Sequence, residues 1–156
     1  MKHISILIAK KKIIEMKESG SVIVFTNGCF DILHKGHLTY LNHARKLGNY
    51  LIVGLNSDVS VSNLKGSDRP INSQNFRSKQ LLDLDAVDDV IIFNEDTPQN
   101  LINELQPNIL VKGGDYSIDN VVGADTVISH GGSVEIVDLI PDKSTSSLID
   151  RVLKLK

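Results

Sequence analysis

The stretch Val22–His37, VIVFTNGCFDILHKGH, predicts a strand, a tight loop and the start of a helix, in that order. The apolar residues 22–25 are typical of a buried strand. The residues from Leu38 to Leu47 have the periodicity of a helix, and a glycine-containing loop separates the two segments. A strand that passes through a tight loop into a helix favours an α/β fold.

Two histidines, His34 and His37, stand at the start of the expected helix. Because they are three residues apart, they share one helix face. Unpaired N–H groups and a partial positive charge make a helix N-terminus favourable for phosphate. Gly36 lacks a Cβ atom, so an anion can approach the backbone there. An imidazole pair in this place can donate hydrogen bonds to phosphate oxygens as charge shifts during a reaction.

Strand-like and helical segments alternate along the chain. The expected strands cover residues 22–26, 50–55, 89–93, 109–112 and 134–138. The expected helices cover residues 4–18, 37–47, 73–84, 98–105, 120–129 and 145–155, with Thr97 as the cap of the fourth and Pro98 as its first residue. This pattern predicts a doubly wound five-stranded parallel sheet, covered on both faces. In such folds ligands bind at the carboxyl ends of the strands.

The composition narrows the class of protein. With 156 residues, 41% of them hydrophobic, the chain is expected to form one domain, an N-terminal helix in residues 1–20 followed by a catalytic core in 21–156. A formal net charge of −2 argues against a nucleic-acid-binding surface. A single cysteine excludes an internal disulfide and fits a reducing compartment. Without a transmembrane segment or signal peptide, we expect a cytoplasmic protein that has no membrane partner.

Several familiar motifs are missing. There is no Gly-x-Gly-x-x-Gly fingerprint of dinucleotide-binding domains and no Walker sequence of P-loop kinases. Zinc is not favoured either, because Cys29 has no second cysteine to accompany it and no His-Glu-x-x-His pattern occurs. We therefore expect no protein-held metal site.

The segment Thr26–His37 resembles the signature of the cytidylyltransferase-like nucleotidyltransferases. Within that superfamily the chain is most similar to the D-glycero-β-D-manno-heptose 1-phosphate adenylyltransferases, which occur alone or as the C-terminal half of a bifunctional heptose kinase/adenylyltransferase. The likeness runs from about Val22 to Val152 and includes further matching segments: Gly54–Asp58, Leu64–Gly66 through Arg69–Pro70, Ala86–Asp88, Glu95–Pro98, Leu110–Tyr116 and Ser144–Ser146. This resemblance implies a Rossmann-like nucleotidyltransferase fold.

The resemblance also implies a reaction. ATP and a heptose 1-phosphate would give ADP-heptose and pyrophosphate, with Mg²⁺ brought in by the triphosphate and held mainly by phosphate oxygens and water. The expected partners are these small molecules and further copies of the chain, in a homodimer or larger homo-oligomer.

The residues that match the family's site are expected to form three sets: catalytic, nucleotide-binding and substrate-binding. The catalytic set comprises His34, His37, Lys65 on the loop after the second strand, and Arg77, whose guanidinium would grip phosphate. The nucleotide-binding set comprises Thr26, Asn27, Gly28, Cys29, Phe30, Gly36, His37, Lys112, Gly113, Asp115, Ser144, Thr145 and Ser146. The substrate-binding set comprises Asp31, Asn56, Asp58 and Tyr116.

At three positions the chain departs from the family. Asn75 and Phe76 replace an acidic residue and an arginine, so one phosphate contact is lost or moves to Lys79. Lys143 replaces an apolar residue just before the Ser-Thr-Ser segment. These departures are the only support for a nucleotide-sensing module that has lost turnover.

Two other substrate pairs remain open. The same chemistry would serve a glycerol-3-phosphate or other alcohol-phosphate cytidylyltransferase, or an FMN adenylyltransferase. The segment Lys112–Tyr116, KGGDY, favours the heptose branch, because glycerol-phosphate relatives usually have a Gly-Asp-Asp-Trp-like segment there. The choice between ATP and CTP is not determined by the sequence.

Overall fold

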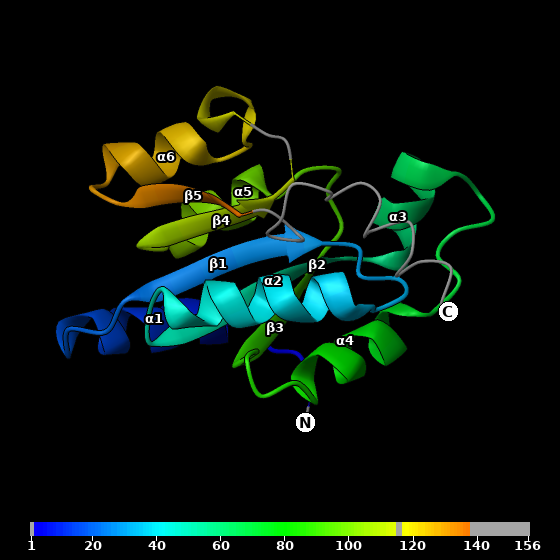
Figure 1. Ribbon diagram of the computed structural model, residues 1–156, viewed down its shortest axis with the longest axis horizontal. Helices are drawn as coiled ribbons and strands as arrows, with labels where there is room; N and C mark the ends of the chain where they lie inside the picture. Colours follow the sequence, from blue (N-terminus) through cyan, green and yellow to red (C-terminus); the bar gives the residue numbers. More distant parts are fainter. Residues whose placement is uncertain (1, 115–116, 138–156) are drawn as a thin grey trace.

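The computed structural model describes residues 2–114 and 117–137, and within them five parallel strands form one sheet (Figure 1). The strands are β1 (Ile23–Gly28), β2 (Tyr50–Asn56), β3 (Asp89–Phe93), β4 (Ile109–Gly113) and β5 (Ser133–Val137). Their order in the sheet is β3-β2-β1-β4-β5, and every neighbouring pair is parallel. The predicted five-stranded parallel sheet is confirmed.

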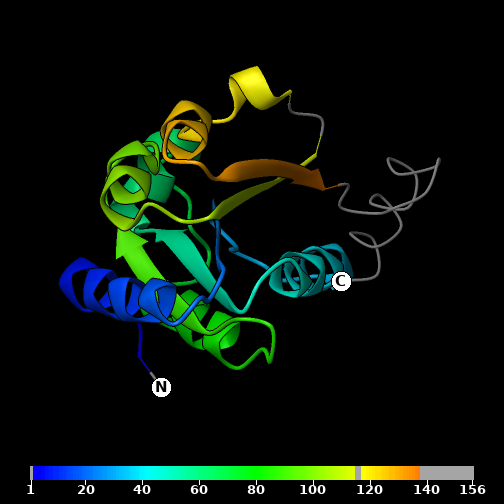
Figure 2. The same cartoon turned by 90° about the vertical axis from the view of Figure 1, so that its left-hand side faces the viewer.

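Helices cover both faces of this sheet. They are α1 (Ile6–Glu18), α2 (Lys35–Lys46), α3 (Asp58–Lys65), α4 (Gln74–Leu82), α5 (Gln99–Leu105) and α6 (Ala124–Ser129), with a short 3₁₀ helix, η1 (Ile118–Asn120). Buried side chains of α2 and α4 pack on one face of the sheet, and those of α1, α5 and α6 pack on the other. Figure 2 shows the helices in these two layers on either side of the strands.

Alternate residues of the central strands supply the two cores. In β1, Val24 packs with α2 and α4, whereas Ile23 and Phe25 pack with the opposite helices. In β2, Leu51 and Ile52 divide in the same way. Because both faces are covered, successive residues of a strand are apolar, which explains why the sequence shows continuous apolar runs rather than alternation.

The helix α3 was not predicted from the sequence, which favoured a loop there. Two β-branched valines, Val59 and Val61, give this segment a low intrinsic helix propensity. The helix is supported instead by the Ser57 hydroxyl, which accepts a hydrogen bond from the Ser60 N–H at 3.1 Å. A serine followed by an acidic residue in the first turn, Asp58, was the available signal.

Two helix boundaries also differ from expectation. The helix α5 begins at Gln99 with Pro98 as its N-cap, one residue later than predicted. The expected helix over residues 120–129 is split into η1 and α6, with Gly123 between them at a φ of +89°. The expected helix over residues 145–155 lies outside the described residues.

The strand order reverses next to β1. The chain passes from β1 to β2 and β3 on one side and then returns to place β4 on the other side of β1. At such a reversal the connecting loops diverge and leave a crevice beyond the carboxyl ends of the strands. Here those ends are Gly28 of β1 and Gly113 of β4.

Candidate active site

Two hollows lie at the carboxyl ends of the strands. The first has a volume of about 420 Å³ and the second about 250 Å³. Residues 27–29, at the end of β1 and the start of the loop that follows it, line both hollows and form the wall between them. The first hollow is also lined by Phe30, Asp31, Ile32, His34, His37, Tyr40, Lys65 and Arg69. The second is also lined by Asn56, Leu64, Asp96, Thr97, Pro98, Lys112, Asn120, Val121 and Val122.

The two histidines stand together at the start of α2. His34 is the N-cap, and its ring stacks on the ring of His37 with the centroids 3.9 Å apart. The prediction that they share one face is confirmed. Phe30 packs edge-on against His37 with a centroid distance of 5.4 Å. Because Phe30 has a φ of +45°, the loop holds this ring in place at some cost in backbone strain.

Hydrogen bonds at the start of the helix indicate the tautomer of each neutral imidazole ring. The Gly36 N–H donates to Nδ1 of His34 at 3.1 Å, and the His34 N–H donates to Nδ1 of His37 at 3.4 Å. A nitrogen that accepts a hydrogen bond carries no proton, so each neutral ring has its proton on Nε2. Each histidine therefore has Nε2–H as its donor, as the stabilisation of phosphate oxygens requires.

Gly36 serves the histidines in a way that was not expected from the sequence. A Cβ atom at this position would lie 2.9 Å from Cε1 and 3.0 Å from Nδ1 of His34. The sequence suggested that Gly36 lets an anion approach the backbone. In the structure its missing side chain makes room for the His34 ring, so any larger residue would displace that ring.

Two cationic side chains line the first hollow besides the histidines. Lys65 is the exposed last residue of α3 rather than a loop residue, so the expected loop position was wrong. Arg69 also lines the hollow, although it was not among the site residues predicted from the sequence. The pair Arg69-Pro70 in the matching segment was the signal that pointed to it. These cations suit a polyanionic ligand.

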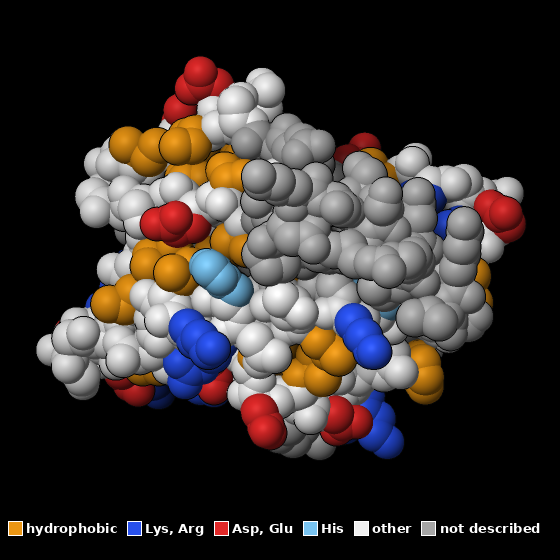
Figure 3. All heavy atoms as spheres, in the orientation of Figure 1, with side chains coloured by type: hydrophobic (Ala, Val, Ile, Leu, Met, Phe, Trp, Pro, Cys, Tyr) orange, Lys and Arg blue, Asp and Glu red, His pale blue; other side chains and the backbone are white. Residues whose placement is uncertain are grey.

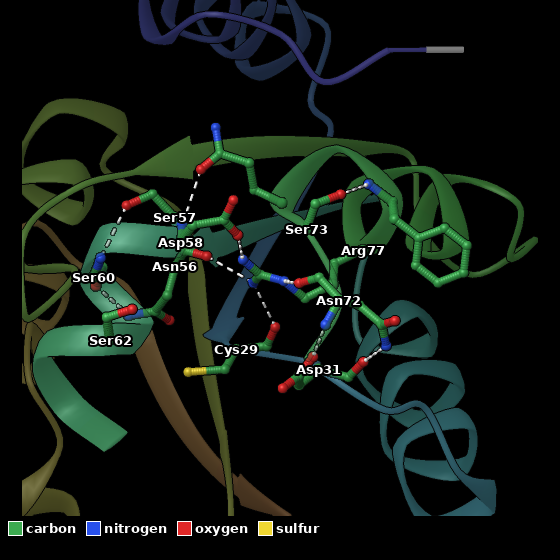
Figure 4. Close-up of polar contacts among 12 residues, drawn as sticks. Cys29, Asp31, Asn56, Ser57, Asp58, Ser60, Ser62, Asn72, Ser73 and Arg77 are labelled. Carbon is green, nitrogen blue, oxygen red and sulfur yellow. Dashed lines mark hydrogen bonds and ion pairs between the residues drawn. The ribbon is translucent and has the colours of Figure 1, made fainter. Parts of the chain in front are cut away.

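Arg77 has a different place from the one expected. Its side chain is fully buried, and it donates from Nε to the Asn72 carbonyl at 2.9 Å. One terminal nitrogen donates to the carbonyls of Cys29 at 2.8 Å and Asn56 at 2.7 Å. The other lies 2.8 Å from Oδ1 of Asp58 (Figure 4). The structure thus replaces the expected phosphate contact with a brace that joins the loops after β1 and β2 to the start of α4.

Asp31 joins the same group of loops. Its carboxylate accepts hydrogen bonds from the backbone N–H groups of Ile71 and Asn72, each at 2.8 Å, and from Nε of Arg69 at 3.1 Å. Burial raises the pKa of Asp31, but these hydrogen bonds and the nearby Arg69 charge outweigh burial and hold the pKa below its usual value. The carboxylate is therefore ionised and held by the protein, which gives Asp31 a structural role; because Asp31 also lines the first hollow, its expected contact with substrate stays a prediction.

Thr26 lies in the core rather than in either hollow. Its side chain is fully buried and forms a hydrogen bond with the hydroxyl of Tyr40. That hydroxyl donates to the carbonyl of Val111 at 3.0 Å, so it joins α2 to β4. Burial raises the pKa of Tyr40 to about 12, against the opposing effect of the Thr26 hydrogen bond. The expected nucleotide contact of the Thr26 side chain does not fit this position.

The remaining residues of the predicted site divide between the hollows and the surface. Lys112, near the end of β4, lines the second hollow, and burial lowers the pKa of its ammonium group. Gly113 ends β4, and the N–H of Gly114 donates to the carbonyl of Val137 on the neighbouring strand. Phe76 and Lys79 are exposed on α4 and line neither hollow, so Lys79 is not placed to take over a phosphate contact.

Five of the predicted residues lie outside the described part of the chain: Asp115, Tyr116, Ser144, Thr145 and Ser146. Their expected contacts with nucleotide or sugar stay predictions. The same holds for the departure from the family pattern at Lys143.

In the described ranges, no three His, Cys, Asp or Glu side chains converge to hold an ion. Figure 3 shows acidic and basic side chains interspersed on the face drawn, rather than gathered by sign. No helix within the described residues has the length and apolar character needed to cross a membrane.

Known proteins resemble this chain in sequence. The model of the cytidylyltransferase-like family matches residues 25–149. The chain is 52% identical over 137 residues to the bifunctional protein HldE of Syntrophotalea carbinolica, covering 88% of this chain, and 56% identical over 132 residues to HldE of Pseudomonas fluorescens, covering 85%. It spans about 28% of the length of each of these relatives.

A solved structure adds a likeness in three dimensions. The lipopolysaccharide core biosynthesis protein from Thermoplasma volcanium is 32% identical and superposes with a TM-score of 0.63, covering 76% of this chain and 96% of that one. A family match over most of the sequence, together with relatives of this similarity, shows that the chain belongs to the cytidylyltransferase-like family.

Proposed function

We propose that the chain is a nucleotidyltransferase that transfers AMP from ATP to D-glycero-β-D-manno-heptose 1-phosphate, giving ADP-heptose and pyrophosphate. The observation that carries this proposal is the stacked pair His34 and His37, held at a helix N-terminus with Nε2–H as donors and lining a hollow of about 420 Å³. The choice of heptose rests on the resemblance of the sequence and on the similarity to HldE.

The proposed reaction is the transfer of a nucleotidyl group from ATP to the phosphate of the sugar. A phosphate oxygen of the sugar attacks the α-phosphorus of ATP, and the bond from that phosphorus to the bridging oxygen breaks, so that pyrophosphate leaves with the electron pair. The attacking oxygen is already anionic, and no strong general base is needed. The protein has to position two polyanions and stabilise the charge that spreads over the reacting phosphate.

The described residues can meet this requirement. The imidazoles of His34 and His37 donate hydrogen bonds to the phosphate oxygens, and Lys65 and Arg69 supply positive charge from other segments around the hollow. Mg²⁺ held by the triphosphate and water supplies further neutralisation of charge. The brace around Arg77 keeps the histidine loop in place beside the end of β2.

Pyrophosphate release tests the proposal. Wild-type protein is assayed with Mg²⁺ across a grid of ATP and CTP against heptose 1-phosphate, glycerol 3-phosphate and FMN. We expect release with ATP and heptose 1-phosphate, and a fall of about 10²- to 10³-fold in kcat for His37→Ala, which removes one transition-state donor. His43→Ala is the matched control, because His43 is exposed on the same helix and lines neither hollow.

The grid separates the mechanism from the substrates. Release with glycerol 3-phosphate or FMN alone would keep the chemistry and correct the acceptor, and release with CTP alone would correct the nucleotide. No release with any pair would contradict the proposal. The family resemblance further favours a homodimer or larger homo-oligomer that acts in the cytoplasm; sedimentation velocity tests the oligomeric state.

A further inference from the structure

We propose that Tyr40 is a positioning residue for nucleotidyl transfer: its hydroxyl ties α2 to β1 and β4 and thereby fixes where His37 stands in the first hollow. The inference rests on the proposed function and deepens it, because it says what holds the histidine pair in place. Tyr40 was not among the site residues predicted from the sequence, although it follows His37 by three residues on α2.

The strands β1 and β4 part before they reach their carboxyl ends. Their parallel pairing ends at Phe25 of β1 and Leu110 of β4. Each strand still pairs with its other neighbour, β1 with β2 as far as Gly28 and β4 with β5 as far as Gly113. The strands on either side of the reversal in strand order therefore diverge, and the crevice of the candidate site opens between them.

The Tyr40 hydroxyl spans this opening. It forms a hydrogen bond with the side chain of Thr26 on β1, and it donates to the carbonyl of Val111 on β4 at 3.0 Å. Both bonded residues come directly after the last paired position of their strand. A side chain of α2 thus links the two strands at the point where their own pairing has ended.

The bonds of this hydroxyl have a fixed direction. Because its single proton goes to the Val111 carbonyl, the Thr26 hydroxyl must donate to the Tyr40 oxygen. Tyr40 is only 4% exposed, and burial raises its pKa to about 12, so the phenol keeps its proton at neutral and moderately alkaline pH. The side chain therefore acts as a permanent tie and not as an acid or a base.

The tie lies next to a site residue in each of the three segments that it joins. On α2, His37 lies one turn before Tyr40, and both side chains line the first hollow. On β1, the residue after the bonded threonine is Asn27, part of the wall between the hollows. On β4, the residue after the bonded valine is Lys112, which lines the second hollow. The positions of the histidine, the wall and the lysine are therefore coupled through one hydroxyl.

Kinetics of Tyr40→Phe test the inference, because the substitution removes the hydroxyl and keeps the ring. Without the tie α2 can shift against the strands, and a misplacement of about 1 Å can lower a rate about 100-fold. We expect kcat to fall roughly 10- to 100-fold, while the KM for ATP changes less than about threefold, since the imidazole acts mainly on charge that develops in the transition state. The pH profile of kcat/KM should keep its wild-type shape, because the phenol does not titrate in that range.

A control and a double variant separate positioning from a general loss of stability. Tyr50→Phe makes the same chemical change at the start of β2, outside both hollows, at a buried hydroxyl that has no hydrogen-bond partner among the described residues; kcat should stay within about twofold of wild type. In a His37→Ala background, Tyr40→Phe should lower kcat less than about twofold, because the histidine through which it acts is already gone. A loss of folded protein would instead lower kcat equally in both backgrounds.

NMR spectroscopy keeps this test apart from the test of the proposed function, because the imidazole signals of His37 can be followed without substrate. Tyr40→Phe should shift those signals and leave the signals of His130, which is exposed outside both hollows. Absence of turnover in wild-type protein would contradict the proposed function, and the His37 signals would still decide the inference. Unchanged His37 signals, wild-type kcat in Tyr40→Phe, an equal fall in both backgrounds or a lost ionisation in the pH profile would overturn it.

Discussion

The replacement Arg77→Met should destabilise the protein strongly, because a buried guanidinium joins three backbone carbonyls from separate segments. The substitution keeps an unbranched apolar stem but removes the donors to Asn72, Cys29 and Asn56. Removing one partner of a buried, charged hydrogen-bonding group typically costs about 3–5 kcal/mol. The ion pair with Asp58 adds little, since that carboxylate is 43% exposed and exposed pairs contribute about 1 kcal/mol or less.

Urea unfolding measures this loss directly. For a chain of this length, a loss of that size corresponds to a fall in Tm of roughly 6–20 °C. Lys79→Met is the matched control, because it removes an exposed cation from the same helix and should change the free energy of unfolding by less than about 0.5 kcal/mol. Asp58→Asn isolates the ion pair and should cost about 1 kcal/mol or less.

The stability and the ATP affinity of Arg77→Met together decide whether Arg77 has a structural role. If Arg77→Met unfolds at the urea concentration of the wild type but binds ATP much more weakly, the guanidinium acts on phosphate, as the sequence suggested. If the variant is destabilised and its folded fraction retains ATP binding within a few-fold, the hydrogen bonds to the loops account for its effect. Calorimetric titration of ATP at a temperature well below the Tm of the variant separates the two.

Two further predictions concern Asp31 and Gly36. The folded pKa of Asp31 lies below its unfolded value, so its ionised form stabilises the fold at neutral pH, and this contribution is lost as the pH falls below about 4. Asp31→Asn should therefore cost about 1–3 kcal/mol at pH 7 and progressively less towards pH 3, measured by urea unfolding; an equal cost at both pH values would contradict this. Gly36→Ala should lower kcat at least about tenfold, because the new Cβ displaces the His34 ring, while a Tm within a few degrees of wild type shows that the fold is kept. Full activity in that variant would show that the ring can move aside without loss.

The parallel sheet was predictable because its signal is local. Continuous apolar runs such as residues 22–25 indicate strands that are buried on both faces of the sheet. The periodic segments between them indicate amphipathic helices. The short helix α3 was not predictable in the same way. Its valines favour strands, and it forms where a capping serine and the neighbouring loops support it.

The candidate site was predictable only in part. The pair His34 and His37 was found because the spacing of three residues fixes a common helix face. Arg77 and Asp31 were assigned to ligands on the strength of their residue type and their match to the family. The structure gives both a role in holding loops, because hydrogen-bond partners from other segments use their polar atoms.

The sequence by itself determined the α/β architecture, the helix start at the histidine pair and the family to which the chain belongs. These depend on periodicity and on motifs within a few residues of one another. Only the tertiary structure decided which polar groups remain available to a ligand. Arg77 meets the Cys29 carbonyl across 48 positions of the sequence, and the Tyr40 hydroxyl of α2 bonds to the Val111 carbonyl of β4. Such contacts arise from packing between distant segments, and no local pattern encodes them.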